Sequence, residues 1–302
     1  MPIVLAGMAA ATFGVADFLG GTAARRTPSA VVAVLAQLAG LAALLVLLPL
    51  LPAVVDHRAL AWGLLAGLAG GVGVPLLYRG LAEGPMNVVA PLTALTSAGV
   101  PVLAGTLLGE RPSAAAWLGI GLAVVAGVLV GVTAGPSELP DPDDPSAARP
   151  ARPARRVARG VALALFAGAC FGGFFVLIAQ AAPTAGLWPV ATARVSGSLV
   201  AALVLVTVVR AARSASESGA AGSVRRPGWW LAAACGVLDA TANAVYLLAV
   251  QHGELSVVGG VVALYPASTV LLARVWHGER IGRVQRVGLA LAVPALLLVG
   301  GG

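Results

Sequence analysis

Apolar residues fill ten stretches of this chain, and short polar or turn-forming segments separate each stretch from the next. A helix that crosses the hydrocarbon core of a membrane needs about 20 mostly apolar residues, and each stretch is close to that length. The pattern therefore predicts ten membrane-spanning helices. We place them at 3–23, 29–51, 59–81, 85–108, 113–133, 158–181, 185–209, 228–250, 255–276 and 284–301.

The segment between the fifth and sixth predicted helices differs from the other separators in composition. It reads AGPSELPDPDDPSAARPARPARRVARG, which is rich in proline, acidic in its first part and basic in its second. Such a segment cannot bury enough apolar surface to fold, so we expect a flexible linker. The chain then divides into a first five-helix repeat at 1–133, a linker at 134–157 and a second five-helix repeat at 158–302.

An internal duplication relates the two halves. Residues 84–131 align with residues 253–300 without a gap, at an offset of 169, and 19 of the 48 aligned residues are identical. Both segments contain Gly-Glu-Arg, at 109–111 and at 278–280, and both continue into a glycine-rich apolar run. Shared Ala, Val and Leu raise the identity, but the coincident Gly-Glu-Arg is hard to obtain from composition.

Because five is an odd number, two copies joined end to end must cross the membrane in opposite senses. The duplication therefore predicts two inverted repeats related by a pseudo-two-fold axis in the membrane plane, an architecture common in secondary transporters. A substrate path would lie between the halves, near the midplane of the membrane. Glu110 of the first Gly-Glu-Arg comes just before the next predicted helix, where a carboxylate favours the positive helix end. We expect this structural role for it, rather than a direct role in transport.

The composition excludes an ordinary soluble domain. Apolar residues make up 59% of the chain and charged residues only 10%, whereas soluble domains are about 45–50% apolar and about 25% charged. All 19 basic residues are arginines, the net charge is +7, and the arginines flank the apolar stretches. We therefore expect them to orient the protein in a lipid bilayer and not to bind nucleic acid.

No sequence motif indicates a cofactor or a metal. The two cysteines, Cys170 and Cys235, both fall inside apolar stretches and have no spacing of a disulfide framework or metal site. The chain contains no phosphate-binding loop and no zinc-protease or serine-hydrolase motif, which argues against built-in ATP hydrolysis.

Charged residues inside membrane-spanning helices are costly and are candidates for function. Arg194 lies within the seventh predicted helix, Asp239 near the middle of the eighth, and Asp17 within the first. At about 1.5 Å per residue, Arg194 and Asp239 differ in depth by roughly 6 Å, which an arginine side chain can reach. Two interpretations stay open. Either Arg194 binds a substrate carboxylate while Asp239 or Asp17 takes an amine or a proton, or a permanent Arg194–Asp239 pair only braces two helices.

The duplication adds one argument for a site. It aligns Asp239 with Gly70 and places Arg194 near Gln37, so the charged residues break the pseudo-symmetry, as a site for an asymmetric solute must. Asn243 is one helical turn from Asp239 and shares its face. The candidate substrate-binding residues are Asp17, Gln37, Asn87, Gln180, Arg194, Asp239, Asn243 and Tyr265.

Prolines interrupt two predicted helices at corresponding positions of the two repeats. Pro91 and Pro101 lie in the fourth helix, and Pro266 follows Tyr265 in the ninth. A proline frees backbone carbonyl groups at membrane depth, which is tolerated where they line a cavity or find other partners. This pair of interrupted spans is the best pointer in the sequence to the position of a binding site, although a packing kink explains each proline taken singly about as well.

The paired motifs resemble those of the drug/metabolite transporter superfamily, and within it the EamA-like family. The residues that carry the resemblance are Ala94-Leu95, Pro101, Gly109-Glu110 and Gly119, and in the second repeat Ala263-Leu264, Pro266, Gly278-Glu279 and Gly288. The resemblance implies a ten-helix carrier for a small organic solute, often an exporter of amino acids or drugs, in the bacterial cytoplasmic membrane. An intramembrane enzyme and a non-transporting membrane scaffold are the alternatives.

The expected partners are therefore a small-molecule substrate and the lipid bilayer. A proton is a candidate coupling ion, because two carboxylates lie inside predicted helices. Gly63, Gly67 and Gly71 form successive GxxxG spacings, which allow helices to approach closely. Packing within one chain explains them more simply than a dimer contact, so we expect a monomer or a weak homodimer.

The arginines also predict an orientation. Sixteen of the 19 lie at or beside the odd-numbered loops, and only Arg58 and Arg111 lie at the even-numbered ones. Short arginine-rich loops stay in the cytoplasm, which places both termini outside. The family resemblance instead implies cytoplasmic termini, and we follow the arginine count.

Overall fold

The computed structural model describes residues 1–83, 86–131, 154–215, 228–277 and 281–301, and every regular element in these ranges is a helix. The α-helices are α1 (Pro2–Ala24), α2 (Ser29–Leu47), α3 (His57–Glu83), α4 (Met86–Leu107), α5 (Ala114–Gly131), α6 (Ala154–Ala179), α7 (Trp188–Ala215), α8 (Trp229–His252), α9 (Leu255–Val262), α10 (Tyr265–His277) and α11 (Arg283–Gly301). Short 3₁₀ turns, Leu48–Leu50 and Pro183–Ala185, follow α2 and precede α7.

The helices cross the bundle ten times. In the described ranges, nine segments are long and apolar enough to span a membrane, and one of them, Leu255–Trp276, comprises α9 and α10 together. The tenth crossing is α4, whose apolar part is the shorter segment Pro91–Leu107. These crossings match the ten predicted stretches, so the protein is an all-α integral membrane protein.

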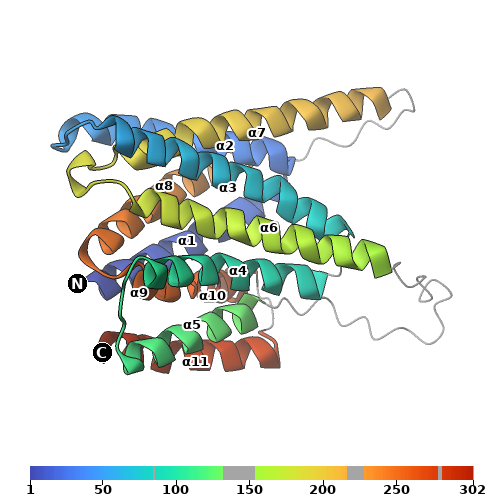
Figure 1. The fold of residues 1–302 in the computed structure, drawn as a ribbon. Coiled ribbons are helices and arrows are strands. Elements are labelled where there is room, and N and C mark those ends of the chain that lie inside the picture. Colours follow the sequence, from blue (N-terminus) through green and yellow to red (C-terminus); the bar gives the residue numbers. More distant parts are fainter. Residues whose placement is uncertain (84–85, 132–153, 216–227, 278–280, 302) are drawn as a thin grey trace, which may run out of the picture.

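Both chain termini lie at the same end of the bundle (Figure 1). Since α1 starts at this end, Arg25 and Arg26, which follow α1, lie at the opposite end. There the Glu83 carboxylate of α3 binds Arg79 Nε at 3.3 Å and Arg159 Nε of α6 at 3.2 Å. The described arginines at the ends of α1 and α3 and at the start of α6 thus share one end, as the counting of loops predicts.

The ninth predicted span is not one helix. α9 ends at Val262 and α10 begins at Tyr265, so Pro266 falls in the first turn of α10, where its missing N–H removes no helical hydrogen bond. By contrast, α4 remains continuous through Pro91 and Pro101. The expectation of two interrupted spans is therefore right for the ninth and wrong for the fourth, if interruption means a break in the helix.

The two halves interlock instead of lying beside each other. α3 of the first half packs against α6 and α7 of the second, and α8 of the second half packs against α1 and α2 of the first. Helices α1, α2 and α3 of the first half correspond to α6, α7 and α8 of the second. The contact of α3 with α6 therefore corresponds to that of α8 with α1, and the contact of α3 with α7 to that of α8 with α2. This reciprocal packing is expected of two inverted five-helix repeats.

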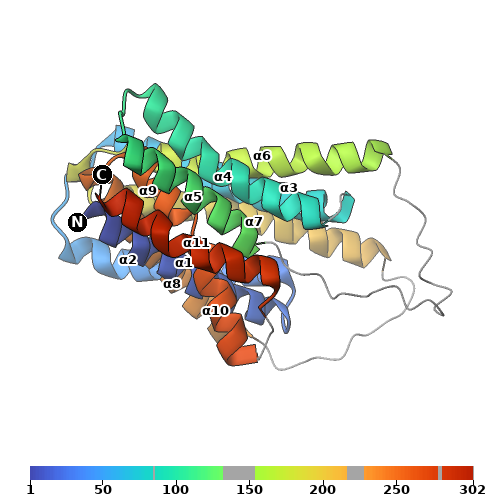
Figure 2. The ribbon, with the colours of Figure 1, turned by 90° about the horizontal axis from the view of Figure 1, so that it is seen from below.

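Contacts between α5 and α11 show the two-fold relation residue by residue. These helices lie side by side in both ribbon views (Figures 1 and 2). Gly119 of α5 packs against Val299 of α11, and Gly288 of α11 packs against Val130 of α5. The offset of 169 relates Gly119 to Gly288 and Val130 to Val299. A reciprocal contact of this kind requires a local two-fold axis between the two helices.

The glycine spacings in α3 serve packing within the chain. Gly63, Gly67 and Gly71 all lie against α7, so close that a β-carbon on Gly67 would overlap the backbone of Ala193. Ser196 of α7 donates a hydrogen bond from Oγ to the Leu64 carbonyl at 2.8 Å. Small residues thus bring α3 and α7 together within one chain.

Large apolar side chains lie both inside and outside the bundle. The main core cluster draws on both halves, for example Phe13 and Leu44 from the first and Ile178 and Tyr246 from the second. Many other large apolar side chains are exposed, among them Leu203, which is 64% exposed. An outer surface of this composition suits lipid and not water.

Candidate functional site

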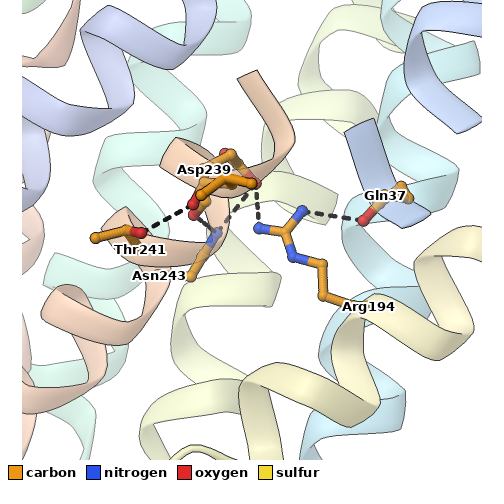
Figure 3. A network of polar contacts seen from close by, with 6 residues as sticks. Gln37, Arg194, Asp239, Thr241 and Asn243 are labelled. Atoms are coloured by element: carbon orange, nitrogen blue, oxygen red, sulfur yellow. Dashed lines mark hydrogen bonds and ion pairs between the residues drawn. The ribbon is translucent and has the colours of Figure 1, made fainter. Parts of the chain in front are cut away.

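The centre of the candidate site is the guanidinium of Arg194 on α7. Its Nη1 donates a hydrogen bond to Gln37 Oε1 of α2 at 3.0 Å, and its Nη2 forms an ion pair with Asp239 Oδ2 of α8 (Figure 3). The Arg194 side chain is only 8% exposed, and that of Asp239 is 32% exposed. Three helices from both halves therefore converge on one buried guanidinium.

Small residues allow this convergence. Gly236, on the same helix as Asp239, packs against the backbone carbonyl of Ala36, next to Gln37. Gly40 packs in turn against Gly236 and Ala240, and Gly197 leaves room for the Gln37 amide. Larger side chains at these positions would separate α2, α7 and α8, since the β-carbons would overlap neighbouring atoms.

Asn243 extends the network along α8, as its spacing from Asp239 predicts. Its Nδ2 donates to the backbone carbonyl of Asp239 at 2.8 Å and lies 3.3 Å from Asp239 Oδ2. Both neighbours are acceptors, which fixes the amide nitrogen toward Asp239. The amide oxygen, Oδ1, has no hydrogen-bond partner although Asn243 is only 3% exposed.

Asp17 lies on α1 beside this network. Its side chain is exposed, and it lies close enough to Asp239 for the two carboxylates to repel each other. It is also within electrostatic range of the Tyr265 hydroxyl at the start of α10. Within the part of the chain that the structure describes, no hydrogen bond or ion pair reaches Asp17.

Tyr265 connects this region to a narrow cavity between the two halves. The cavity is lined by Ala94, Ser97, Ala98, Pro101, Val124, Gly127, Val128, Phe175, Tyr246, Gly259, Val262, Ala263 and Tyr265. These residues come from α4, α5 and α6, and from α8 through α10. The cavity thus lies beside the break in the ninth span, with a proline of α4 and glycines of α5 and α9 along its wall.

Tyr246 is a site residue that sequence reasoning missed. It follows Asn243 by one turn of α8, lines the cavity, and donates its hydroxyl to the Phe175 carbonyl at 3.4 Å. Its ring lies 4.7 Å from that of Phe175, which also contacts Phe13. Its spacing from Asp239 and Asn243 on the same helix was the available signal.

One predicted residue, Gln180, is not part of this arrangement. Gln180 follows the end of α6 and is exposed, and its side-chain amide donates to the Val176 carbonyl at 3.3 Å. In the described ranges, no hydrogen bond joins this amide to the Arg194 network. Asn87 belongs to α4, but its side chain lies outside the described residues. In the described ranges, no group of three or more His, Cys, Asp and Glu residues could hold a metal ion.

Ten crossings in two interlocked, inverted halves, with charged side chains in the middle of the bundle, define a polytopic membrane protein of the inverted-repeat type. The model of one family, the EamA-like transporter family, matches residues 1–132 and again residues 158–301. The chain belongs to the EamA-like transporter family.

Solved structures share the fold. Seventeen of their chains match, and one of them, described only as a crystal structure of a protein, superposes with a TM-score of 0.71 at 15% sequence identity. That comparison covers 98% of this chain and 94% of the other. At this identity the likeness shows the fold alone. No curated protein matches the chain.

Proposed function

We propose that the protein is a secondary transporter that moves a small organic solute across the membrane by alternating access. The observation that carries the proposal is the break in the ninth span beside the cavity. Val262, Ala263 and Tyr265, at and next to the break, all line that cavity. In secondary transporters built from inverted repeats, discontinuous helices typically form the substrate site near the midplane of the membrane.

The path in this proposal runs between the two repeats. The cavity has walls from both halves, and the Arg194 network joins α2 of the first half to α7 and α8 of the second. Rocking of one half against the other would change which end of the bundle the cavity opens toward. The division into repeats at 1–133 and 158–302, joined by a linker, is part of this proposal.

The family resemblance favours export of an amino-acid-like solute or a drug across the cytoplasmic membrane of a bacterium. A proton remains the candidate coupling ion, because Asp17 and Asp239 both lie at membrane depth. We propose a monomer or a weak homodimer as the working unit, since the glycine spacings of α3 are already used inside the chain.

Counterflow into liposomes tests the proposal. Purified protein is reconstituted, the liposomes are loaded with unlabelled solute, and uptake of labelled amino acids, sugars, nucleosides and cationic drugs is followed. A carrier gives transient, saturable uptake of at least one solute, which liposomes without protein do not give. The variant Asp239→Asn should lose this uptake, whereas Asp56→Asn, at the bundle end, should keep it. Conversion of a solute to product indicates an enzyme, and neither activity indicates a scaffold.

A further inference from the structure

The charges at the centre of the bundle do not balance. Arg194 is paired with Asp239, so these two side chains together are neutral when both are ionised. Asp17, on α1, has no hydrogen bond or ion pair with any described residue. With all three groups ionised, the centre of the bundle therefore carries one uncompensated negative charge. A charge at membrane depth without a partner is expensive, and a ligand of opposite charge removes that cost.

The packing of α1 against α8 brings Asp17 to the network. The helices are antiparallel, because Gly20 lies against the Cys235 thiol while Gly253, at the far end of α8, lies against Pro2. In this register Asp17 is level with Asp239.

On its other side Asp17 is close to α10. One turn before Asp17, the Gly14 carbonyl accepts a hydrogen bond from Thr269 Oγ1 at 3.1 Å, and Gly14 packs against the backbone of Tyr265. Phe18, next to Asp17, contacts Trp276 near the end of α10. Asp17 therefore lies between the middle of α8 and α10, one turn beyond the level at which Gly14 contacts the start of α10.

The accessible groups here are the carboxylates and not the guanidinium. Asp17 is exposed and the Asp239 side chain is 32% exposed, whereas the Arg194 side chain is 8% exposed. A solute that reaches this point meets negative charge first. The guanidinium is already occupied, since it donates to Gln37 and to Asp239.

A second, independent observation also indicates a ligand that donates hydrogen bonds. Asn243 is 3% exposed, and its Oδ1 has no donor, although its amide nitrogen is bonded to Asp239. A buried acceptor without a donor is costly, and a donating ligand removes that cost. Asn243 lies one turn from Asp239 on the same face of α8, and Asp17 is level with Asp239.

We infer that Asp17 and the Asn243 amide oxygen bind the ammonium group of a positively charged substrate, beside Tyr265. The inference rests on the proposed transport function and names its substrate class. Asp17 supplies the opposite charge, and Asn243 accepts one N–H of the ammonium group. Arg194 acts as a positioning residue, because it holds Asp239 in place and does not contact a substrate carboxylate.

The test compares three solutes of similar size that differ in charge: phenethylamine, phenethyl alcohol and phenylpropionate. Binding to purified full-length protein in detergent is measured from the rise in melting temperature with ligand concentration. We expect the amine to bind wild type and the other two not to bind. Asp17→Asn should weaken amine binding at least about tenfold, as loss of a charge-paired contact does. Asp17→Glu should restore it to within a few-fold of wild type, and Asp56→Asn should not change it.

Three results would overturn the inference: no stabilisation by the amine, equal stabilisation by the carboxylate, or unchanged amine affinity in Asp17→Asn. The last result is also what a role for Asp17 in proton coupling alone would give. If Asp17→Asn does not fold, the charge series on wild type and on Asp17→Glu decides.

The liposome assay separates this inference from the proposed function. Counterflow of neutral or acidic solutes only would refute the ammonium site and leave transport intact. Amine binding without counterflow of any solute would keep the site and refute transport.

Discussion

Glu110 of the first half accepts a hydrogen bond from the backbone N–H of Ser256 in the second half, at 2.9 Å, and its other carboxylate oxygen accepts from Leu255. These two N–H groups belong to the first turn of α9, so a negative charge faces the positive end of that helix. From the sequence we expected the Glu110 carboxylate to stabilise the positive end of α5 and not that of α9. At the start of α5 Ser113 serves instead, since its Oγ accepts from the Ala116 N–H at 3.1 Å.

Removing this carboxylate should loosen the contact between the halves at the end where the termini lie. We expect Glu110→Gln to lower stability by about 1 kcal/mol, the usual contribution of a helix cap, and so to lower the melting temperature in detergent by a few degrees. Glu254→Gln is the matched control, because Glu254 is the N-cap residue of α9 and its side chain makes no cap hydrogen bond. Equal melting temperatures for Glu110→Gln and wild type would show that the contact adds nothing to stability.

The buried pair of Arg194 and Asp239 should behave as a unit. Breaking a buried ion pair by removing one partner typically costs about 3–5 kcal/mol, because the other charge is left unpaired. We therefore expect Arg194→Gln to lower the melting temperature strongly, and Arg194→Gln with Asp239→Asn to recover much of that loss while transport stays absent. Thermal melting of the two single variants and the double variant measures the coupling. Losses that simply add would contradict it.

The sequence predicts the neighbours of the Arg194–Asp239 pair better than it predicts the partner of Glu110, and the reason is physical. Depth within a span and one helical turn are local properties, so spacing alone puts Arg194 and Asp239 at similar depths and Asn243 on the same face of its helix as Asp239. The partner of Glu110 lies 145 residues away along the chain, in the other half, and only tertiary packing brings it close. Sequence spacing suggests that Glu110 caps the nearest helix, α5, whereas in the folded protein it caps α9.

The same distinction explains the fold. The lengths of the apolar stretches predict ten crossings, and the duplication predicts two inverted halves. Both features can be read directly from the sequence. Prolines predict an interruption in both the fourth and the ninth span, but only the ninth breaks, between Val262 and Tyr265, whereas α4 continues through Pro101. A proline limits the helix locally, but neighbouring helices decide whether the chain bends or breaks.

Gly119 and Gly121 of α5 offer a matched test of the α5–α11 contact. A β-carbon on Gly119 would overlap Val299 of α11, whereas nothing lies within 4 Å of a β-carbon on Gly121. Gly119→Leu should therefore cost about 1–3 kcal/mol from overpacking, seen as a lower melting temperature, and Gly121→Leu should be tolerated.

The two-fold relation adds a second expectation to this test. Gly288→Leu should destabilise about as much as Gly119→Leu, because Gly288 makes the reciprocal contact with Val130. A large effect from only one of the two substitutions would contradict the reciprocal packing of α5 and α11.

The structure shows where to place probes of the orientation in the membrane. Arg26 follows α1 at the arginine-rich end of the bundle, and Val54 precedes α3 at the end that holds both termini, where it is 65% exposed. Short arginine-rich loops stay in the cytoplasm, so the Arg26 end should be inside and the Val54 end outside.

In a background in which Cys170 and Cys235 are replaced by alanine, Val54→Cys should react with an impermeant maleimide in intact cells. Arg26→Cys should react only in inverted vesicles. The opposite labelling of both positions would place the termini in the cytoplasm, as the family resemblance implies. The inverted repeat would stand in either case, because it depends on the crossing number of each half and not on the side from which the first helix enters.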